Sequence, residues 1–92
     1  MDELMEQVKR GANLLDEKSP GWRDHIDLST LDMRGRVSCI LGQIYGSYGQ
    51  GRRALDLIPF TESEYYGFWA STQDQSRSLN DAWKEYLEPS TL

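Results

Sequence analysis

The sequence predicts a small all-α domain, a helical bundle of about three helices joined by irregular connectors. Apolar residues recur at helical spacing in three separate segments, near residues 2–18, 36–49 and 78–88. Prolines and glycines interrupt the chain between these segments, where connectors are expected. The length of 92 residues, with 38% hydrophobic and 27% charged residues, fits a single globular domain over residues 1–92.

The first predicted helix covers residues 2–18 and is amphipathic, because its apolar residues share one side and its polar residues the other. The apolar side consists of Leu4, Met5, Val8, Ala12 and Leu15. Pro20, in the segment SPGW, is expected to end this helix, since proline lacks the backbone donor that a helix needs. In residues 21–35 the apolar spacing fits no single period, so we expect a connector whose apolar side chains enter the core.

The second predicted helix covers residues 36–49, although each glycine inside a helix costs about 1 kcal/mol relative to alanine. Its large side chains share one broad face, which we expect to meet the core: Val37, Ile40, Leu41, Ile44, Tyr45 and Tyr48. The small residues share the opposite side, where they predict a groove for close approach of another backbone: Cys39, Gly42, Gly46 and Gly49. The alternative interpretation ends the helix at Gly46 and makes GSYGQG a loop.

The third predicted helix covers residues 78–88 and begins at Ser78, which together with Asp81 resembles a capping box. Its apolar stripe consists of Leu79, Ala82, Trp83, Tyr86 and Leu87. Between the second and third helices we expect an irregular lid. This lid contains half of the ten aromatic residues of the chain: Phe60, Tyr65, Tyr66, Phe68 and Trp69.

The lid is the candidate protein-binding site, because tyrosine and tryptophan dominate binding hot spots and loops display such residues. The aromatic part of the site is expected to be Tyr65, Tyr66, Phe68 and Trp69, with Tyr66 or Trp69 as the anchor. Glu62 and Glu64 would form an acidic rim that steers a basic partner. In the alternative interpretation the same aromatic residues fold back and seal the core, since a small domain needs their buried area.

The net charge of −5 disfavours nucleic acid and anionic membranes as partners, because both attract basic surfaces. Arg52 and Arg53 beside Tyr45 and Tyr48 resemble a minimal stacking patch for nucleic acid, but the overall charge opposes that role. The acidic residues are spread singly, which is more typical of a solvated helical surface than of a DNA mimic. The sequence shows neither a secretory signal nor a membrane span, so we expect a cytoplasmic protein without a membrane partner.

Cys39 is the only cysteine, which rules out an intramolecular disulfide and the cysteine-rich zinc frameworks. We therefore predict no metal, no cofactor and no catalytic residue, and a buried Cys39 that serves packing. The alternative function is a small enzyme or ligand-binding protein that uses Cys39 as nucleophile and His25 as base, with Asp24 or Asp27 orienting the base.

Several motifs resemble those of a set of short uncharacterised proteins of actinobacteriophages and related bacteria. The motifs are GANLLDEKSPGW, IDLSTLDM, CILGQIYGSYGQG, YYGF and LNDAW, and they span most of residues 11–83. Members often carry a second cysteine two or three positions before the one matching Cys39, where this chain has Val37 and Arg36. The resemblance implies a phage or prophage origin and production in the host cytoplasm, and it assigns no activity or ligand. The expected function is a noncatalytic accessory protein that binds and modulates a host protein, and a homo-oligomer is compatible with the sequence.

Overall fold

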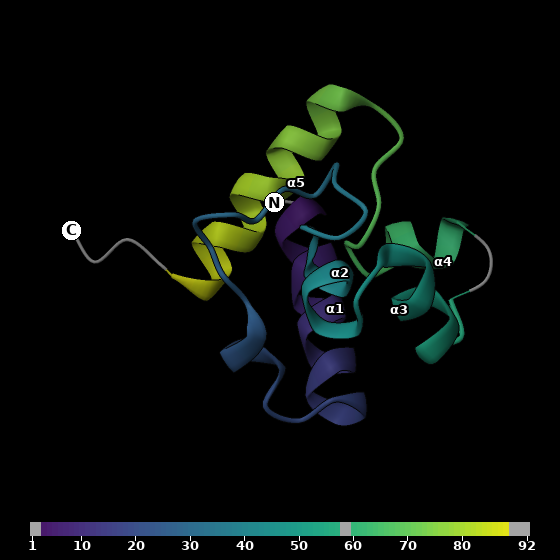
Figure 1. Cartoon of the computed structure of the whole chain (residues 1–92). Coiled ribbons are helices and arrows are strands. Elements are labelled where there is room, and N and C mark those ends of the chain that lie inside the picture. Colours follow the sequence, from purple (N-terminus) through teal and green to yellow (C-terminus); the bar gives the residue numbers. More distant parts are fainter. Residues whose placement is uncertain (1–2, 58–59, 89–92) are drawn as a thin grey trace.

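Two long helices, α1 (Glu3–Lys18) and α5 (Gln73–Leu87), pack against each other and frame the molecule (Figure 1). The computed structural model describes residues 3–57 and 60–88. The other helical elements are the 3-10 helix η1 (Trp22–His25), α2 (Ile40–Tyr45), α3 (Tyr48–Ala54) and α4 (Phe60–Tyr65). Over the described ranges the chain forms helices and no β-strand, which confirms the predicted all-α class.

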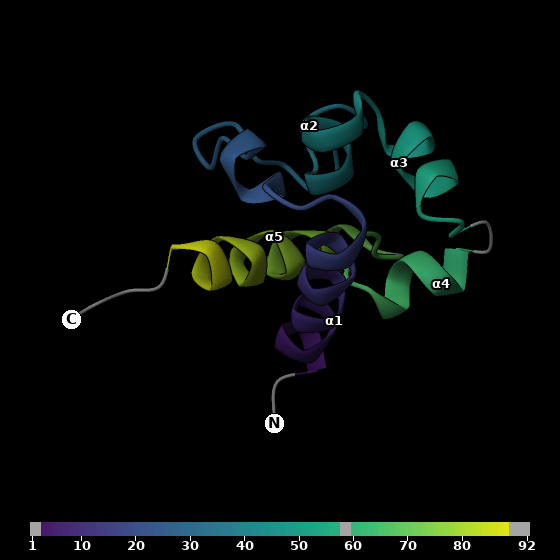
Figure 2. The ribbon, with the colours of Figure 1, turned by 90° about the horizontal axis from the view of Figure 1, so that it is seen from below.

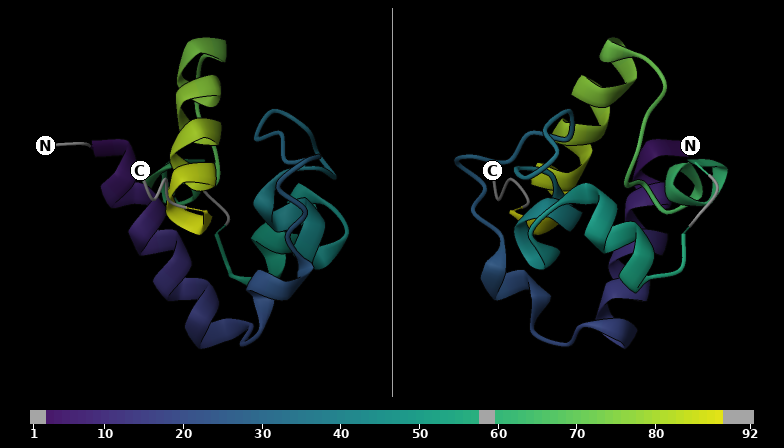
Figure 3. Two further views of the ribbon diagram at one scale, coloured as in Figure 1. Left: turned by 90° about the vertical axis from the view of Figure 1, so that its left-hand side faces the viewer. Right: turned by 45° about the vertical axis from the view of Figure 1, so that its right-hand side comes forward.

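The short helices α2 and α3 lie apart from α4 around the α1–α5 pair. Figures 2 and 3 show α2 and α3 together on the same side of this pair, and α4 lies against α1. Three residues of the predicted apolar stripe of α1, Val8, Ala12 and Leu15, have no exposed surface. Leu4 and Met5 of the same stripe are partly buried, and Gly11, outside the stripe, is buried as well. Residue 2, the predicted start of this helix, lies outside the described residues.

The core is centred on Trp83 of α5. Its ring stacks on Phe68 with centroids 5.9 Å apart, and it meets the edge of Trp22 at 6.1 Å. All three aromatic side chains are fully buried. Trp22 belongs to the irregular stretch after α1, together with the buried Leu31 and Met33, so the expectation that this connector fills the core is confirmed.

The prediction of one continuous helix over residues 36–49 is wrong, because the chain turns sharply at Gly46, between α2 and α3. Gly46 has a φ of 100°, a conformation that side chains disfavour and glycine adopts freely. The segment GSYGQG is not a loop either, since Ser47 caps α3 by accepting a hydrogen bond from the Gln50 amide at 3.1 Å. Gly46 therefore serves a change of chain direction.

Of the three glycines predicted to line a groove for close approach of another backbone, only Gly42 has another backbone segment close to it. A Cβ on Gly42 would lie 2.5 Å from the carbonyl carbon of Val37, so the preceding segment of the chain does approach closely there. Gly49 faces open space. Val37, expected in the core, is 64% exposed because α2 begins only at Ile40.

The third predicted helix starts more than a turn earlier than expected. Thr72 is the N-cap of α5, and its hydroxyl accepts a hydrogen bond from the Gln75 amide at 3.1 Å. Ser78 therefore lies inside the helix. The predicted stripe is confirmed, with Leu79, Ala82 and Trp83 buried, and the irregular lid is wrong for α4, which is helical.

Candidate functional site

The aromatic residues of the predicted lid divide into a buried part and a surface part. Phe68 is 1% exposed and belongs to the core, so it is unavailable to a partner and the core-closure interpretation describes it correctly. Tyr65 is 51% exposed, and Tyr66 and Trp69 are half-buried. The surface that a partner could meet therefore narrows to these three aromatic residues.

Tyr65 is held against α1 by Arg10. The Arg10 guanidinium lies over the Tyr65 ring, 4.0 Å from its centroid, and its Nε donates a hydrogen bond of 2.9 Å to the Tyr65 carbonyl oxygen. Tyr65 also meets the edge of Tyr66 at 5.1 Å. These contacts place both tyrosines beside Arg10 of α1, whereas Trp69 lines hollows that neither tyrosine lines.

Trp69 lines a hollow that we call the acidic groove, with a volume of about 450 Å³. The groove is lined by Glu3, Leu4, Gln7, Glu64, Trp69, Ala70, Asp74, Gln75 and Ser78. Its three carboxylates come from α1, α4 and α5, and no lysine or arginine is among these described lining residues. Leu4, Trp69 and Ala70 give it an apolar surface, so it suits a segment that presents a cation beside an apolar side chain.

Two of the three groove carboxylates, those of Glu3 and Asp74, belong to exposed residues, and Glu64 is half-buried. The Glu3 side chain is 76% exposed, and its carboxylate lies 3.6 Å from the Arg10 guanidinium. Such an exposed pair contributes little and exchanges readily. Glu62, the other predicted acidic residue, is exposed but does not line the groove, whereas Glu64 does.

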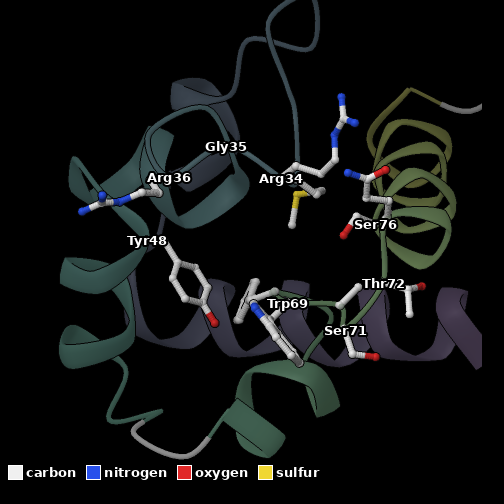
Figure 4. Close-up of a pocket in the computed structure, with 12 residues that line it drawn as sticks. Arg34, Gly35, Arg36, Tyr48, Trp69, Ser71, Thr72 and Ser76 are labelled. Atoms are coloured by element: carbon white, nitrogen blue, oxygen red, sulfur yellow. The ribbon is translucent and has the colours of Figure 1, made fainter.

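On its other side Trp69 lines a second hollow, the Arg34 pocket, of about 320 Å³ (Figure 4). Its lining residues are Met33, Arg34, Gly35, Arg36, Tyr48, Phe68, Trp69, Ala70, Ser71, Thr72, Gln73 and Ser76. This described lining includes two arginines and no carboxylate. Figure 4 shows the side chains of Arg34 and Arg36 directed outward from the pocket, away from Trp69, and Arg34 is paired with Asp32. Trp69 and Ala70 thus lie between the acidic groove and a pocket with an exposed arginine at its rim.

A hydroxyl pair lies buried beside this pocket. The Tyr48 and Ser63 hydroxyl oxygens are inaccessible to solvent, and neither has a hydrogen-bond partner with good geometry among the residues that the structure describes. Burial raises the pKa of the Tyr48 phenol, and the neighbouring Ser63 hydroxyl partly counters this rise. The pair therefore favours a neutral tyrosine at this position.

Cys39 and His25 do not form a nucleophile and base. Cys39 is 1% exposed and its Sγ accepts the Gly42 amide hydrogen at 3.3 Å as the N-cap of α2. Burial raises the pKa of this thiol, which opposes formation of the nucleophilic thiolate. His25 is exposed at the end of η1, and Asp27 accepts hydrogen bonds from Ser29. None of the hydrogen bonds found for Cys39 within residues 3–57 and 60–88 involves His25.

The predicted stacking patch for nucleic acid is not assembled. Tyr45 shares a hydrogen bond with the hydroxyl of Ser19 and is turned toward the end of α1. The Arg52 guanidinium lies 5.7 Å from the Tyr48 ring centroid, but its Nε donates to the Leu57 carbonyl oxygen at 3.0 Å. Both partners are therefore engaged within the protein.

The described part of the chain offers neither a metal-binding cluster nor a membrane-spanning helix. No group of three or more histidine, cysteine, aspartate or glutamate side chains there is arranged to hold a metal ion. None of the helices found over those residues combines the length and apolarity that crossing a membrane requires.

Comparison with known proteins gives no relative. No family model, no curated protein and no solved structure matches this chain. The resemblance to short phage proteins stays a prediction, and the site rests on its geometry and charge.

The structure adds residues to the site that sequence reasoning missed. Glu3, Leu4 and Asp74 join Trp69 and Glu64 in one groove, although about 70 residues separate the first from the last. Each looks like an ordinary residue of an amphipathic helix, and Glu3 and Asp74 lie in first helical turns, where carboxylates are common. Only the packing of α1 against α5 reveals that they are neighbours.

Proposed function

We propose that the protein is a noncatalytic interaction module that holds a basic segment of another protein in the acidic groove. The observation that carries this proposal is the position of Trp69, half-buried in a groove whose described lining includes Glu64 and Asp74 and no lysine or arginine. A tryptophan in a hollow gives a large contact area, and the carboxylates around it select a positively charged partner. In the phage setting that the resemblance implies, this partner is a host protein.

The arrangement also supports a particular mode of contact. A lysine or arginine of the partner places its charged head among the carboxylates, while the stem of the same side chain packs on the Trp69 ring. A neighbouring apolar residue of the partner meets Leu4 and Ala70. The groove thus requires a cation and an apolar side chain close together on the partner.

A peptide titration tests this function directly. The probe is a pentapeptide of alternating lysine and leucine, its control is the glutamate and leucine counterpart, and the readout is the indole NMR signal of Trp69. We expect saturable shifts with the lysine peptide alone. Shifts of equal size with both peptides, or with neither, contradict the proposal.

Two charge reversals on the same helix provide a matched control. Glu64→Lys places a like charge in the groove and should weaken the lysine peptide roughly threefold or more. Glu62→Lys makes the same change in net charge outside the groove and should leave this affinity within experimental error. A capture experiment from host lysate should then recover a partner with Glu62→Lys and lose it with Glu64→Lys and with Trp69→Ala.

A further inference from the structure

The surface around Trp69 is self-complementary in charge. The acidic groove contributes Glu3, Glu64 and Asp74 on one side of the tryptophan. On the other side the rim of the Arg34 pocket contributes the exposed guanidinium of Arg34, and the two hollows share Trp69 and Ala70. A surface on which an acidic groove and an exposed arginine adjoin can meet a copy of itself after a half-turn, which is the condition for a two-fold symmetric interface.

We propose that two copies of this chain associate through this surface, with Arg34 of each copy entering the acidic groove of the other. The two-fold axis passes near Trp69, so that the two tryptophans face each other across it. The partner copy thereby supplies a cation to a groove whose described lining residues include no lysine or arginine. This inference concerns regulation of the groove described above, and in that respect it rests on the proposed function.

Arg34 is suited to this role by its exposure and its reach. Its side chain is 53% exposed, and Figure 4 shows it rising from the pocket rim on the side of Ser76, away from Trp69. Its Nε lies 3.3 Å from a carboxylate oxygen of the nearby Asp32, in a surface pair of the kind that contributes little free energy. A guanidinium can exchange such a partner for carboxylates in a hollow, where it also stacks on aromatic rings.

The net charge of −5 on each copy opposes association. This repulsion acts over longer distances than the ion pairs and apolar contacts of the interface. At physiological ionic strength exposed charges are screened beyond about 8 Å, so most of the acidic residues of the two copies do not act on one another. The pairs between Arg34 and the groove are made at contact distance, and the apolar area around Trp69 is buried at the same time. Local complementarity therefore decides the association.

Self-association would hide the groove from other partners. A basic segment that binds the groove must displace Arg34 of the second copy, so binding of a partner and formation of the dimer are mutually exclusive. The dimer is then a form in which the groove is covered, and a rising partner concentration shifts the equilibrium from dimer to partner-bound monomer. We expect the lysine and leucine pentapeptide to convert dimer to monomer.

Sedimentation equilibrium on the purified chain tests the proposal. We expect a concentration-dependent dimer for the wild type and monomers for Glu64→Lys and for Arg34→Glu, each measured alone. An equimolar mixture of these two variants should form a dimer again, because position 64 of each then faces an opposite charge at position 34 of the other. Arg53→Glu, an exposed reversal outside both hollows, is the control and should dimerise like the wild type.

The outcomes separate this proposal from the proposed function. A wild type that stays monomeric, or a mixture of the two variants that stays monomeric, overturns the dimer. Circular dichroism of each variant shows whether it is folded, and Glu64→Gln and Arg34→Gln provide milder changes that should weaken the dimer less. Shifts of the Trp69 indole by the lysine peptide in dilute wild-type protein would support the groove function even if no dimer forms. A dimer that persists while the peptide shifts the indole would overturn the mutual exclusion, and a dimer that persists with no indole shift in dilute protein would count against the groove function.

Discussion

The indole nitrogen of Trp83 donates a hydrogen bond of 2.6 Å to the carbonyl oxygen of Gly67. This bond joins α5 to the turn after α4 in a part of the core that water does not reach. Gly67 has a φ of 73°, and a Cβ there would lie 3.0 Å from the backbone of Gln7 in α1. The hydrogen bond therefore lies where three segments distant in the sequence meet.

Trp83→Phe should destabilise the protein, although it keeps a large ring in the core. The change removes the donor and leaves the buried Gly67 carbonyl oxygen without its partner, which costs about 1–3 kcal/mol. Urea unfolding followed by circular dichroism measures the difference. A free energy of unfolding equal to that of the wild type would mean that the bond has no net stabilising effect.

Phe68→Ala should mainly reduce the stability of the protein, whereas Trp69→Ala should mainly reduce its binding of the lysine peptide. Phe68 is fully buried against Trp83, so its truncation should cost about 3–5 kcal/mol of unfolding free energy. Trp69 is half-buried at the edge of two hollows, so its truncation should cost less stability while reducing binding of the lysine peptide by about 2 kcal/mol. Thermal melts and peptide titrations of both variants check this pairing, and an equal loss of stability in the two would place Trp69 in the core.

Gly42→Ala and Gly49→Ala should change the free energy of unfolding in opposite directions. A Cβ at Gly42 meets the backbone of Val37 at 2.5 Å, and the strain should cost about 1–3 kcal/mol. Gly49 lies in α3 with nothing within 4 Å of a new Cβ, so alanine there should stabilise the protein by up to about 1 kcal/mol. Equal unfolding midpoints for the two variants in urea would contradict the close approach at Gly42.

The stability of the protein should fall as the pH rises above 9. Burial raises the pKa of Cys39 above its ordinary value of 9.0 and that of Tyr48 above 10.0. Below these ordinary values both groups are neutral in the folded and the unfolded chain, so their contribution is fully present. At higher pH the unfolded chain loses protons first, and stability is lost as the pH approaches the folded-state values.

Cys39→Ser separates the two contributions. Serine keeps an acceptor at the N-cap of α2 but does not ionise in this range, so the decline in unfolding free energy that begins near pH 9 should be reduced. The decline that begins above pH 10 should remain, because it belongs to Tyr48. An unchanged pH profile in Cys39→Ser would show that the thiol does not contribute.

The sequence predicts well those features that depend on neighbouring residues. The apolar stripes of α1 and α5 follow the helical period, and Val8, Leu15 and Trp83 are buried as expected. The break at Gly46 was foreseen only as an alternative, since a glycine with an apolar neighbourhood fits a helix interior and a turn equally well. The start of α5 was missed because Thr72 and Ser78 are both acceptable caps, and packing decides between them.

The candidate site could be predicted only in part. Trp69 and Glu64 were identified from composition and local position, and both line the acidic groove. Phe68 was indistinguishable from its neighbours until its ring was found stacked on Trp83. The charges that oppose each other across Trp69, Arg34 among them, come from segments whose proximity is a property of the tertiary fold.

The contact between α1 and α5 also sets the order of events during synthesis. Val8 and Leu15 emerge from the ribosome long before Trp83, the side chain around which the core is built. Until α5 has followed, the apolar stripe of α1 lacks the helix that packs against it, and the entropy of the long intervening chain must be lost before that contact forms. A nascent chain stalled before Gln73 should therefore be a substrate for chaperones and proteases, and protection should arise abruptly once α5 is complete.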